Sequence, residues 1–126
     1  MTDKPPVFVI DDEEPVRTSL AKLLRALGFP SETFASGELF LTSDRVGAKA
    51  CLLVDIRMPG MSGLDLIEEL NRRQTPMAAI VMTGHTDMGS LQRLETLKPL
   101  GFLEKPFSVT QLKAILEQWA ATLGRP

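Results

Sequence analysis

Short, continuously apolar runs alternate with longer amphipathic segments along the whole chain. Four of these runs span residues 7–10, 50–54, 78–82 and 100–103. Strands that are apolar at nearly every position, rather than at every second one, are typical of a parallel sheet buried on both faces. Parallel strands need crossover connections, and segments with helical spacing between them supply these. The sequence therefore predicts an α/β fold with helices on both faces of one sheet.

The rest of the pattern completes a single domain over residues 1–126. A fifth, more polar strand is expected at residues 31–34, at or near an edge of the sheet. Pro15 suits the first turn of the first helix, and Gly28 suits its C-terminal end. The five expected helices cover about residues 14–27, 36–44, 64–73, 88–97 and 109–123.

Charge and composition argue against several classes of protein. The net charge of −2 gives no sign of a nucleic-acid-binding surface, so we expect this domain to bind no nucleic acid. No apolar run approaches the ~20 residues of a membrane span, and the first residues lack the features of a signal peptide. We therefore expect a cytoplasmic protein that does not contact a membrane. The single cysteine, Cys51, lies in an apolar run and is predicted to be a buried thiol.

Polar side chains follow the apolar runs at the point where each expected strand ends. They are Asp11 and Asp12, Asp55, Thr83 and Lys105. Ligand sites of open parallel sheets lie at the carboxyl ends of the strands, so we expect these side chains to share one pocket. Three carboxylates, a hydroxyl and an ammonium suit a divalent metal and a phosphoryl group.

Each of these residues has a specific chemical use. Adjacent carboxylates repel, and a hard cation such as Mg²⁺ relieves that repulsion. An acid as close to the core as Asp55 needs a partner or a function, either as a metal ligand or as a nucleophile that forms an acyl phosphate. The Thr83 hydroxyl could donate to a phosphoryl oxygen, and Lys105 could compensate phosphate charge. Structural alternatives exist, including helix capping by the acids and a turn role for Thr83.

Four sequence motifs in order resemble the receiver domain of bacterial two-component response regulators. The resemblance covers about residues 7–123, and the residues within the motifs are most similar to those of FixJ-type receivers. The matching strings are Val-Ile-Asp-Asp-Glu-Glu-Pro at 9–15, Leu-Val-Asp-Ile-Arg-Met-Pro-Gly-Met-Ser-Gly at 53–63, Thr-Gly at 83–84 and Glu-Lys-Pro-Phe at 104–107.

The resemblance implies a fold and a metal site. The fold would be flavodoxin-like (CheY-like), a doubly wound five-stranded parallel sheet with strand order 2-1-3-4-5 and a cis peptide at residues 105–106. Asp55 would be the phosphoryl acceptor. Mg²⁺, or Mn²⁺, would be bound directly by Asp12, Asp55 and the backbone carbonyl of Arg57, with Asp11 acting largely through water.

The resemblance also implies the remaining roles. Thr83 and Lys105 would bind the phosphoryl oxygens, and Thr83 with Phe102 would form the switch. Arg57 and His85 stand two residues beyond the acceptor and the threonine, and we expect them to modulate the lifetime of the phosphate. Such a domain is not an enzyme in the usual sense, although it promotes its own phosphorylation and dephosphorylation.

The implied partners follow from the same family. A sensor histidine kinase, or a small acyl phosphate, would supply the phosphoryl group. Phosphorylation would alter the face made by residues 88–97, 100–103 and 109–123, which could also form a homodimer. That face would control a partner or an output domain outside this chain, most simply a DNA-binding one that regulates transcription.

One departure and three alternatives remain at this stage. Pro99 replaces the turn usual in FixJ-type receivers, and it either simply terminates the helix at 88–97 or makes that helix end early or rearrange. The first alternative is a receiver that binds partners without phosphorylation. The others are a flavin protein and a phosphatase with a nucleophilic aspartate. The run Asp-Asp-Glu-Glu at 11–14 disfavours both, because it is neither a phosphate-cradling loop nor the Asp-x-Asp of such a phosphatase.

Overall fold

Five parallel strands form one sheet in a computed structural model that describes residues 4–84 and 88–123. The strand order is β2-β1-β3-β4-β5, which confirms the expected doubly wound fold. The strands are β1 Val7–Ile10, β2 Ser31–Phe34, β3 Cys51–Asp55, β4 Ala78–Thr83 and β5 Gly101–Glu104. The helices are α1 Glu14–Ala26, α2 Gly37–Leu41, α3 Gly63–Arg72, α4 Met88–Leu97 and α5 Val109–Leu123.

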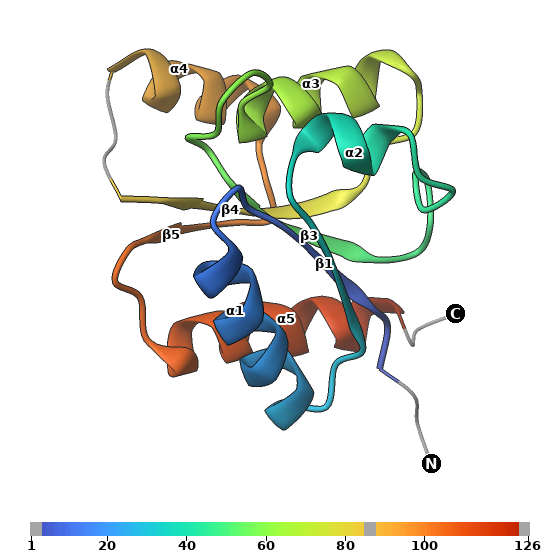
Figure 1. The fold of residues 1–126 in the computed structure, drawn as a ribbon, viewed down its shortest axis with the longest axis vertical. Helices are drawn as coiled ribbons and strands as arrows, with labels where there is room; N and C mark the ends of the chain where they lie inside the picture. Colours follow the sequence, from blue (N-terminus) through green and yellow to red (C-terminus); the bar gives the residue numbers. More distant parts are fainter. Residues whose placement is uncertain (1–3, 85–87, 124–126) are drawn as a thin grey trace.

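Helices cover both faces of the sheet, as Figure 1 shows. On one face α1 and α5 pack against side chains that include Val9, Leu53 and Met82. On the other face α2, α3 and α4 pack against the alternate strand positions, such as Ile10 and Val54. The two apolar layers explain why the central strands are apolar throughout.

The register of the sheet determines which residues reach its carboxyl edge together. Ile10 pairs with Val54, so Asp11 and Asp55 are the next residues of two neighbouring strands. Asp55 pairs with Met82, one residue before Thr83. Thr83 pairs with Glu104, directly before Lys105. Four separate stretches of chain therefore deliver polar side chains to one edge.

The helix ends follow local sequence signals. Pro15 lies in the first turn of α1, and Gly28 after its end has a φ of 89°, a left-handed value that suits glycine. Helix α4 continues to Leu97, the predicted end, and Lys98 then takes a φ of 48° before Pro99. The proline therefore ends α4 at the expected residue and does not shorten it.

Small differences from the predicted boundaries concern the ends of elements. Asp55 and Thr83 are the last residues of their strands rather than the first residues beyond them. Helix α2 ends at Leu41 instead of near residue 44. Thr42 is its C-terminal cap residue, and the Thr42 N–H donates to the Glu38 carbonyl. Strand β5 begins at Gly101, one residue later than predicted.

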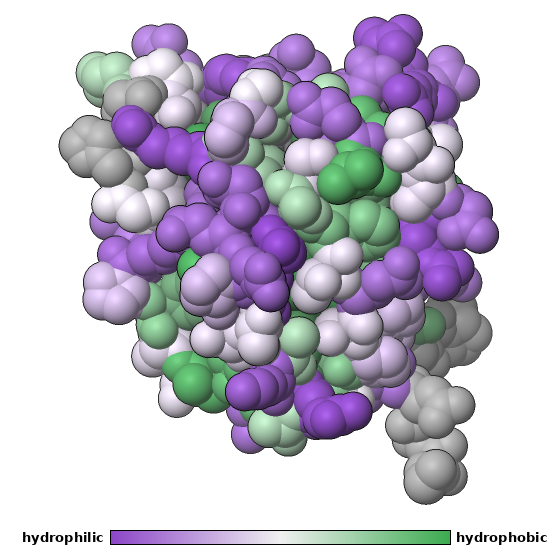
Figure 2. Space-filling view, viewed as in Figure 1, coloured by the Kyte–Doolittle hydropathy of each residue, from purple (hydrophilic) through white to green (hydrophobic). Residues whose placement is uncertain are grey.

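The surface and the single thiol agree with the composition. Hydrophilic side chains predominate on the face drawn in Figure 2, and apolar ones form small patches between them. Cys51 is fully buried, as predicted, and burial raises its pKa to about 12.

In the described part of the chain, no helix combines the length and the apolar character that crossing a membrane requires.

Candidate functional site

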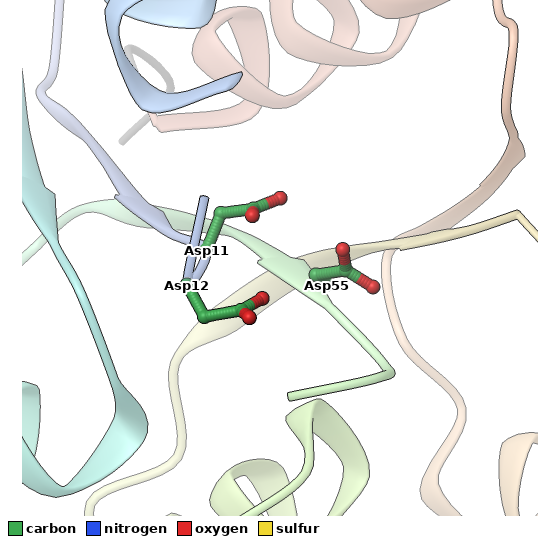
Figure 3. A group of neighbouring side chains, drawn as sticks. All are labelled: Asp11, Asp12 and Asp55. Carbon is green, nitrogen blue, oxygen red and sulfur yellow. The ribbon is translucent and has the colours of Figure 1, made fainter. Parts of the chain in front are cut away.

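Three carboxylates converge at the carboxyl edge of the sheet. Asp11 and Asp12 follow β1, Asp55 ends β3, and the side chains of Asp11 and Asp12 extend toward Asp55 (Figure 3). One oxygen of each lies within 4.8 Å of the others. Asp11 is fully buried and Asp55 is 6% exposed, whereas Asp12 is exposed. The cluster is therefore anchored in the core and open to solvent on the side of Asp12.

Lys105 brings a positive charge to this cluster from the far side of β4. Its Nζ donates a hydrogen bond to Asp55 Oδ2 at 2.8 Å and lies 3.5 Å from Asp11 Oδ2. The backbone N–H of Lys105 donates to the Thr83 carbonyl at 2.7 Å, which continues the β4–β5 ladder to this residue. The peptide between Lys105 and Pro106 is cis, as expected. The sheet thus joins the predicted lysine and acceptor side chains directly.

The electrostatics of the cluster reflect an excess of negative charge. Burial raises the pKa of Asp11, and the Asp55 charge adds to this effect, while the Glu13 N–H and Lys105 oppose it. For Lys105, burial disfavours the charged form, but the hydrogen bonds and charges of Asp55 and Asp11 together outweigh burial and raise its pKa. One ammonium thus compensates three carboxylates only in part.

The donor set fits a divalent metal. Asp11 Oδ1 accepts from the Glu13 N–H at 3.0 Å, but the buried Asp11 Oδ2 accepts no hydrogen bond from any described residue and has the Lys105 ammonium only at ion-pair distance, 3.5 Å away. A buried carboxylate oxygen that accepts no hydrogen bond destabilises the folded state unless a bound cation or a water molecule contacts it. Oxygen ligands from one or two carboxylates with an open, hydrated side are what Mg²⁺ prefers. The residues present therefore fit the predicted ion.

The loop after β3, residues 56–62, is tightly joined to that strand. The Arg57 N–H donates to Asp55 Oδ1 at 3.0 Å, and the Gly63 N–H donates to the Ile56 carbonyl at 3.0 Å. A Cβ at Gly63 would collide with the carbonyl of Asp55, so only glycine lets α3 begin this close to β3. Ser62 and Asp65 then form a reciprocal capping box at the start of α3.

The other predicted residues differ in how deeply they are buried. Thr83 is fully buried at the end of β4, and Phe102 is partly buried against the layer that contains Val81. Arg57 is exposed on the loop beside Asp55. His85 lies outside the described residues.

Sequence reasoning missed one residue that supports the site. The Arg17 guanidinium, one turn into α1, donates to the backbone carbonyl of Asp11 at 2.8 Å. This contact ties the acidic turn to the helix that follows it. A basic residue one turn after four consecutive acids was the available signal, because such a side chain can reach back to the helix start.

We expect Asp11→Asn to stabilise the metal-free protein at neutral pH by about 1 kcal/mol. The pKa of Asp11 is raised above its ordinary value of 3.8, so the folded state holds the proton more tightly than the unfolded state. This group's stabilising contribution is complete below that ordinary value and is lost as the pH rises through the raised pKa. The asparagine does not titrate, so its advantage should grow from acidic to neutral pH. Urea unfolding in EDTA across this range measures the difference.

The matched control is Asp44→Asn, whose side chain is 90% exposed and lies outside the cluster. It should leave the pH dependence of the free energy of unfolding unchanged. A metal-free Asp11→Asn protein that is less stable than wild type at neutral pH would contradict the charge argument. So would a stability difference that does not vary with pH.

Comparison with known families gives one match that covers most of the chain. The model of the response regulator receiver domain matches residues 7–117. Among curated proteins, the chain is 43% identical over 125 residues to the transcriptional regulatory protein FixJ of Azorhizobium caulinodans. It is 36% identical over 117 residues to FixJ of Bradyrhizobium diazoefficiens. These alignments cover 99% and 93% of this chain but only 58% and 57% of the two relatives, so the chain spans little more than half their length.

Solved structures agree with these matches. The structure of FixJ-N superposes with a TM-score of 0.85 at 34% identity, and the alignment covers 100% of both chains. Full-length FixJ from B. japonicum superposes with a TM-score of 0.83 at 35% identity, covering 99% of this chain and 61% of that one. The chemotaxis protein CheY4 of Vibrio cholerae, at 23% identity and a TM-score of 0.80, shares the fold.

Proposed function

Because the chain belongs to the response regulator receiver family, we propose that it is a phosphorylatable switch whose acceptor is Asp55. The observation that carries this proposal is the contact between Lys105 Nζ and Asp55 Oδ2 at 2.8 Å inside a cluster of three carboxylates. A lone buried acid would need only a partner. An acid with a lysine on one side and two further acids on the other suits an incoming phosphoryl group and a cation together.

The chemistry is a phosphoryl transfer to a carboxylate. One oxygen of Asp55 bonds to phosphorus while the bond from phosphorus to the donor breaks, and the donor group leaves with that electron pair. Lys105 compensates charge on the transferred oxygens, and the Thr83 hydroxyl donates to one of them. Water later attacks the acyl phosphate. The domain thus promotes its own modification and its reversal, without acting as an enzyme on another molecule.

Asp11, Asp12, Asp55 and the backbone carbonyl of Arg57 would hold Mg²⁺ or Mn²⁺ beside the acceptor. Asp12 and Asp55 would bind the ion directly, and Asp11 would act largely through water. When bound, the ion supplies positive charge that offsets the repulsion between the acceptor and the phosphoryl oxygens. Asp11 Oδ2 supports this assignment, because it accepts no hydrogen bond from a described residue and has the Lys105 ammonium only at ion-pair distance, 3.5 Å away.

The switch would involve Thr83 and Phe102. Movement of Thr83 toward the phosphoryl group would open space that Phe102, which packs only partly buried against the sheet, could enter. The face formed by α4, β5 and α5 would change with it. Arg57 and His85 would modulate the approach of water to the acyl phosphate.

The wider setting is proposed from the relatives. The chain would be one receiver domain of a cytoplasmic two-component protein, with a sensor histidine kinase as donor. Its relatives carry the name of transcriptional regulators, which supports a DNA-binding output domain in a longer protein. A homodimer through the face of α4, β5 and α5 is the matching proposal for assembly. The complete acid and lysine set favours this function over partner binding without phosphorylation.

Incubation with acetyl phosphate and Mg²⁺ tests the proposal. Intact mass spectrometry should show one phosphoryl group per chain, and the adduct should decay after the donor is removed. EDTA added before the donor should prevent it, since the carboxylates would then repel the donor unopposed. An unmodified mass at saturating donor and Mg²⁺ would refute a phosphoacceptor and return the alternative of a receiver that only binds partners.

A further inference from the structure

We propose that Glu38 is a positioning residue for the acceptor site. Its carboxylate would hold the loop of residues 56–62, here called the acceptor loop, so that the Arg57 carbonyl faces the bound ion. This inference rests on the proposed function, because it assigns a task toward the same ion. It concerns a residue that lies 17 positions before the acceptor in the chain and outside every motif of the sequence analysis.

A hydrogen bond joins α2 to the acceptor loop. Glu38 lies in the first turn of α2, and its Oε2 accepts from the Met61 N–H at 3.2 Å. The two residues are 23 positions apart, so the bond fastens the loop to an element that is not its sequence neighbour. A carboxylate that accepts from a backbone N–H forms a charge-assisted bond, which is stronger than a neutral one.

Glycines on both sides bring the helix and the loop into contact. Gly60 has a φ of 74°, and a Cβ there would stand 2.8 Å from Glu38 Oε2. On the opposite side, a Cβ at Gly37 would stand 3.0 Å from Met61 Sδ. Both atoms end flexible side chains, so a larger residue at either position would displace the Glu38 carboxylate or the Met61 thioether from its place. The two glycines thus leave the space in which these side chains lie between α2 and the loop.

The support behind Glu38 is rigid. Phe40, two residues later, is fully buried, and its ring lies 5.2 Å from that of Phe34 and 5.9 Å from that of Phe8 between centroids. The Ser36 side chain caps the helix by accepting from the Leu39 N–H at 3.0 Å. Although α2 has only five residues, these contacts hold its first turn in place on the sheet.

The two ends of the acceptor loop are already attached to the site. The Arg57 N–H binds Asp55 Oδ1, and Ser62 begins α3 through its capping box. Between these ends, the Glu38 bond at Met61 is the contact that ties the loop to α2. Freeing this point would let the peptide planes of the loop rotate, including the one that carries the Arg57 carbonyl. The expected cost is in affinity for Mg²⁺ and not in the transfer step once the ion is bound.

The test compares Glu38→Ala with Glu38→Gln, which keeps an oxygen acceptor. For Glu38→Ala, we expect the Mg²⁺ concentration that gives half-maximal phosphorylation by acetyl phosphate to rise about threefold to tenfold, at or below the usual range for outer-shell partners. The maximal rate at saturating Mg²⁺ should stay near that of wild type. Glu38→Gln should restore most of the affinity.

Two further measurements separate positioning from loss of fold. Amide exchange at Met61 should accelerate in Glu38→Ala, and Leu39→Ala, a neighbouring change on the exposed side of α2, should alter neither exchange nor Mg²⁺ dependence. An unchanged Mg²⁺ requirement in Glu38→Ala would overturn the inference, as would a Glu38→Gln protein as weak as the alanine variant.

A separate measurement distinguishes a failure of the Glu38 role from a failure of the proposed phosphoacceptor function. Calorimetric titration with Mg²⁺ alone reports binding without any phosphoryl donor. If wild type binds Mg²⁺ but takes no phosphoryl group, the proposed function fails while the role of Glu38 in ion binding is still decided by the titration. If wild type is phosphorylated and Glu38→Ala binds Mg²⁺ as tightly as wild type, only the role of Glu38 is overturned.

Discussion

Asp55→Asn is expected to abolish the phosphoryl adduct formed with acetyl phosphate and Mg²⁺. An asparagine amide is a far poorer nucleophile than a carboxylate, and the other two acids are proposed to serve the metal ion. The substitution should leave the fold intact, because the asparagine Oδ1 can still accept from the Arg57 N–H and the position remains a strand end. The intact mass of the variant after incubation should equal that of the untreated protein.

The control for this experiment is again Asp44→Asn, an exposed acid outside the cluster. It should carry one phosphoryl group at the wild-type rate. An adduct of equal stability on the asparagine variant would move the acceptor to another residue, and peptide mapping would identify which. The acceptor assignment of Asp55 would then be abandoned, although the fold and family would stand.

Lys105→Met is expected to have the second-largest effect. The methionine keeps a chain of similar length but removes the only described cation that contacts both Asp11 and Asp55. Removing one charge-stabilising group from a phosphoryl or acyl transfer site commonly lowers the rate about 10²–10³-fold. The rate of adduct formation at saturating Mg²⁺ measures this loss, and we expect it to fall within that range.

The same substitution should also lower stability when no metal is present. It leaves two largely buried carboxylates without their counter-charge, and we expect a loss of about 1–3 kcal/mol at neutral pH. This is below the cost for a fully buried pair, because the Lys105 side chain is 27% exposed and solvent screens it in part. The raised pKa of Lys105 means that its contribution persists through neutral pH and is lost only in alkaline solution, as the pH rises through that pKa.

Lys105→Arg separates the charge from its geometry. It keeps the positive charge but not the compact ammonium, so it should recover most of the stability and only part of the rate. A methionine variant that forms the adduct as fast as wild type would show that the ammonium contributes nothing to transfer. Unfolding in EDTA and adduct formation should be measured on the same protein samples.

The strand pattern was sufficient to predict which side chains meet at the site. Asp11, Asp55 and Lys105 each follow or end an apolar run, and the parallel register brings the ends of such runs to one edge. This inference needs no knowledge of contacts, since it depends only on strand direction. Boundaries were less accurate by one to three residues, because the last turn of a helix such as α2 depends on capping contacts and not on periodicity.

Contacts of polar side chains with the backbone are less predictable than the meeting of strand ends. The Arg17 bond to the Asp11 carbonyl has a local signal, but the Glu38 bond to Met61 joins residues 23 positions apart that no periodic pattern links. The second bond depends on how closely α2 and the loop approach, and Gly60 leaves the space for it. A sequence shows that a glycine is present, but it does not show which partner occupies the space that the glycine leaves.

Helix α4 differs from the other helices of the domain in how weakly it is attached. None of the side chains over Met88–Leu97, all described by the structure, is buried, and Leu94 and Leu97 are only partly so. Its polar link to α3 is Arg93, which donates to Asp65 at 2.9 Å. Lifting this helix therefore sacrifices little apolar burial, and a stimulus worth only a few kcal/mol could change how often it detaches. Among the described helices, α4 would therefore lose the least core burial on moving, so the phosphorylation proposed at Asp55 could change its position while the rest of the domain stays folded.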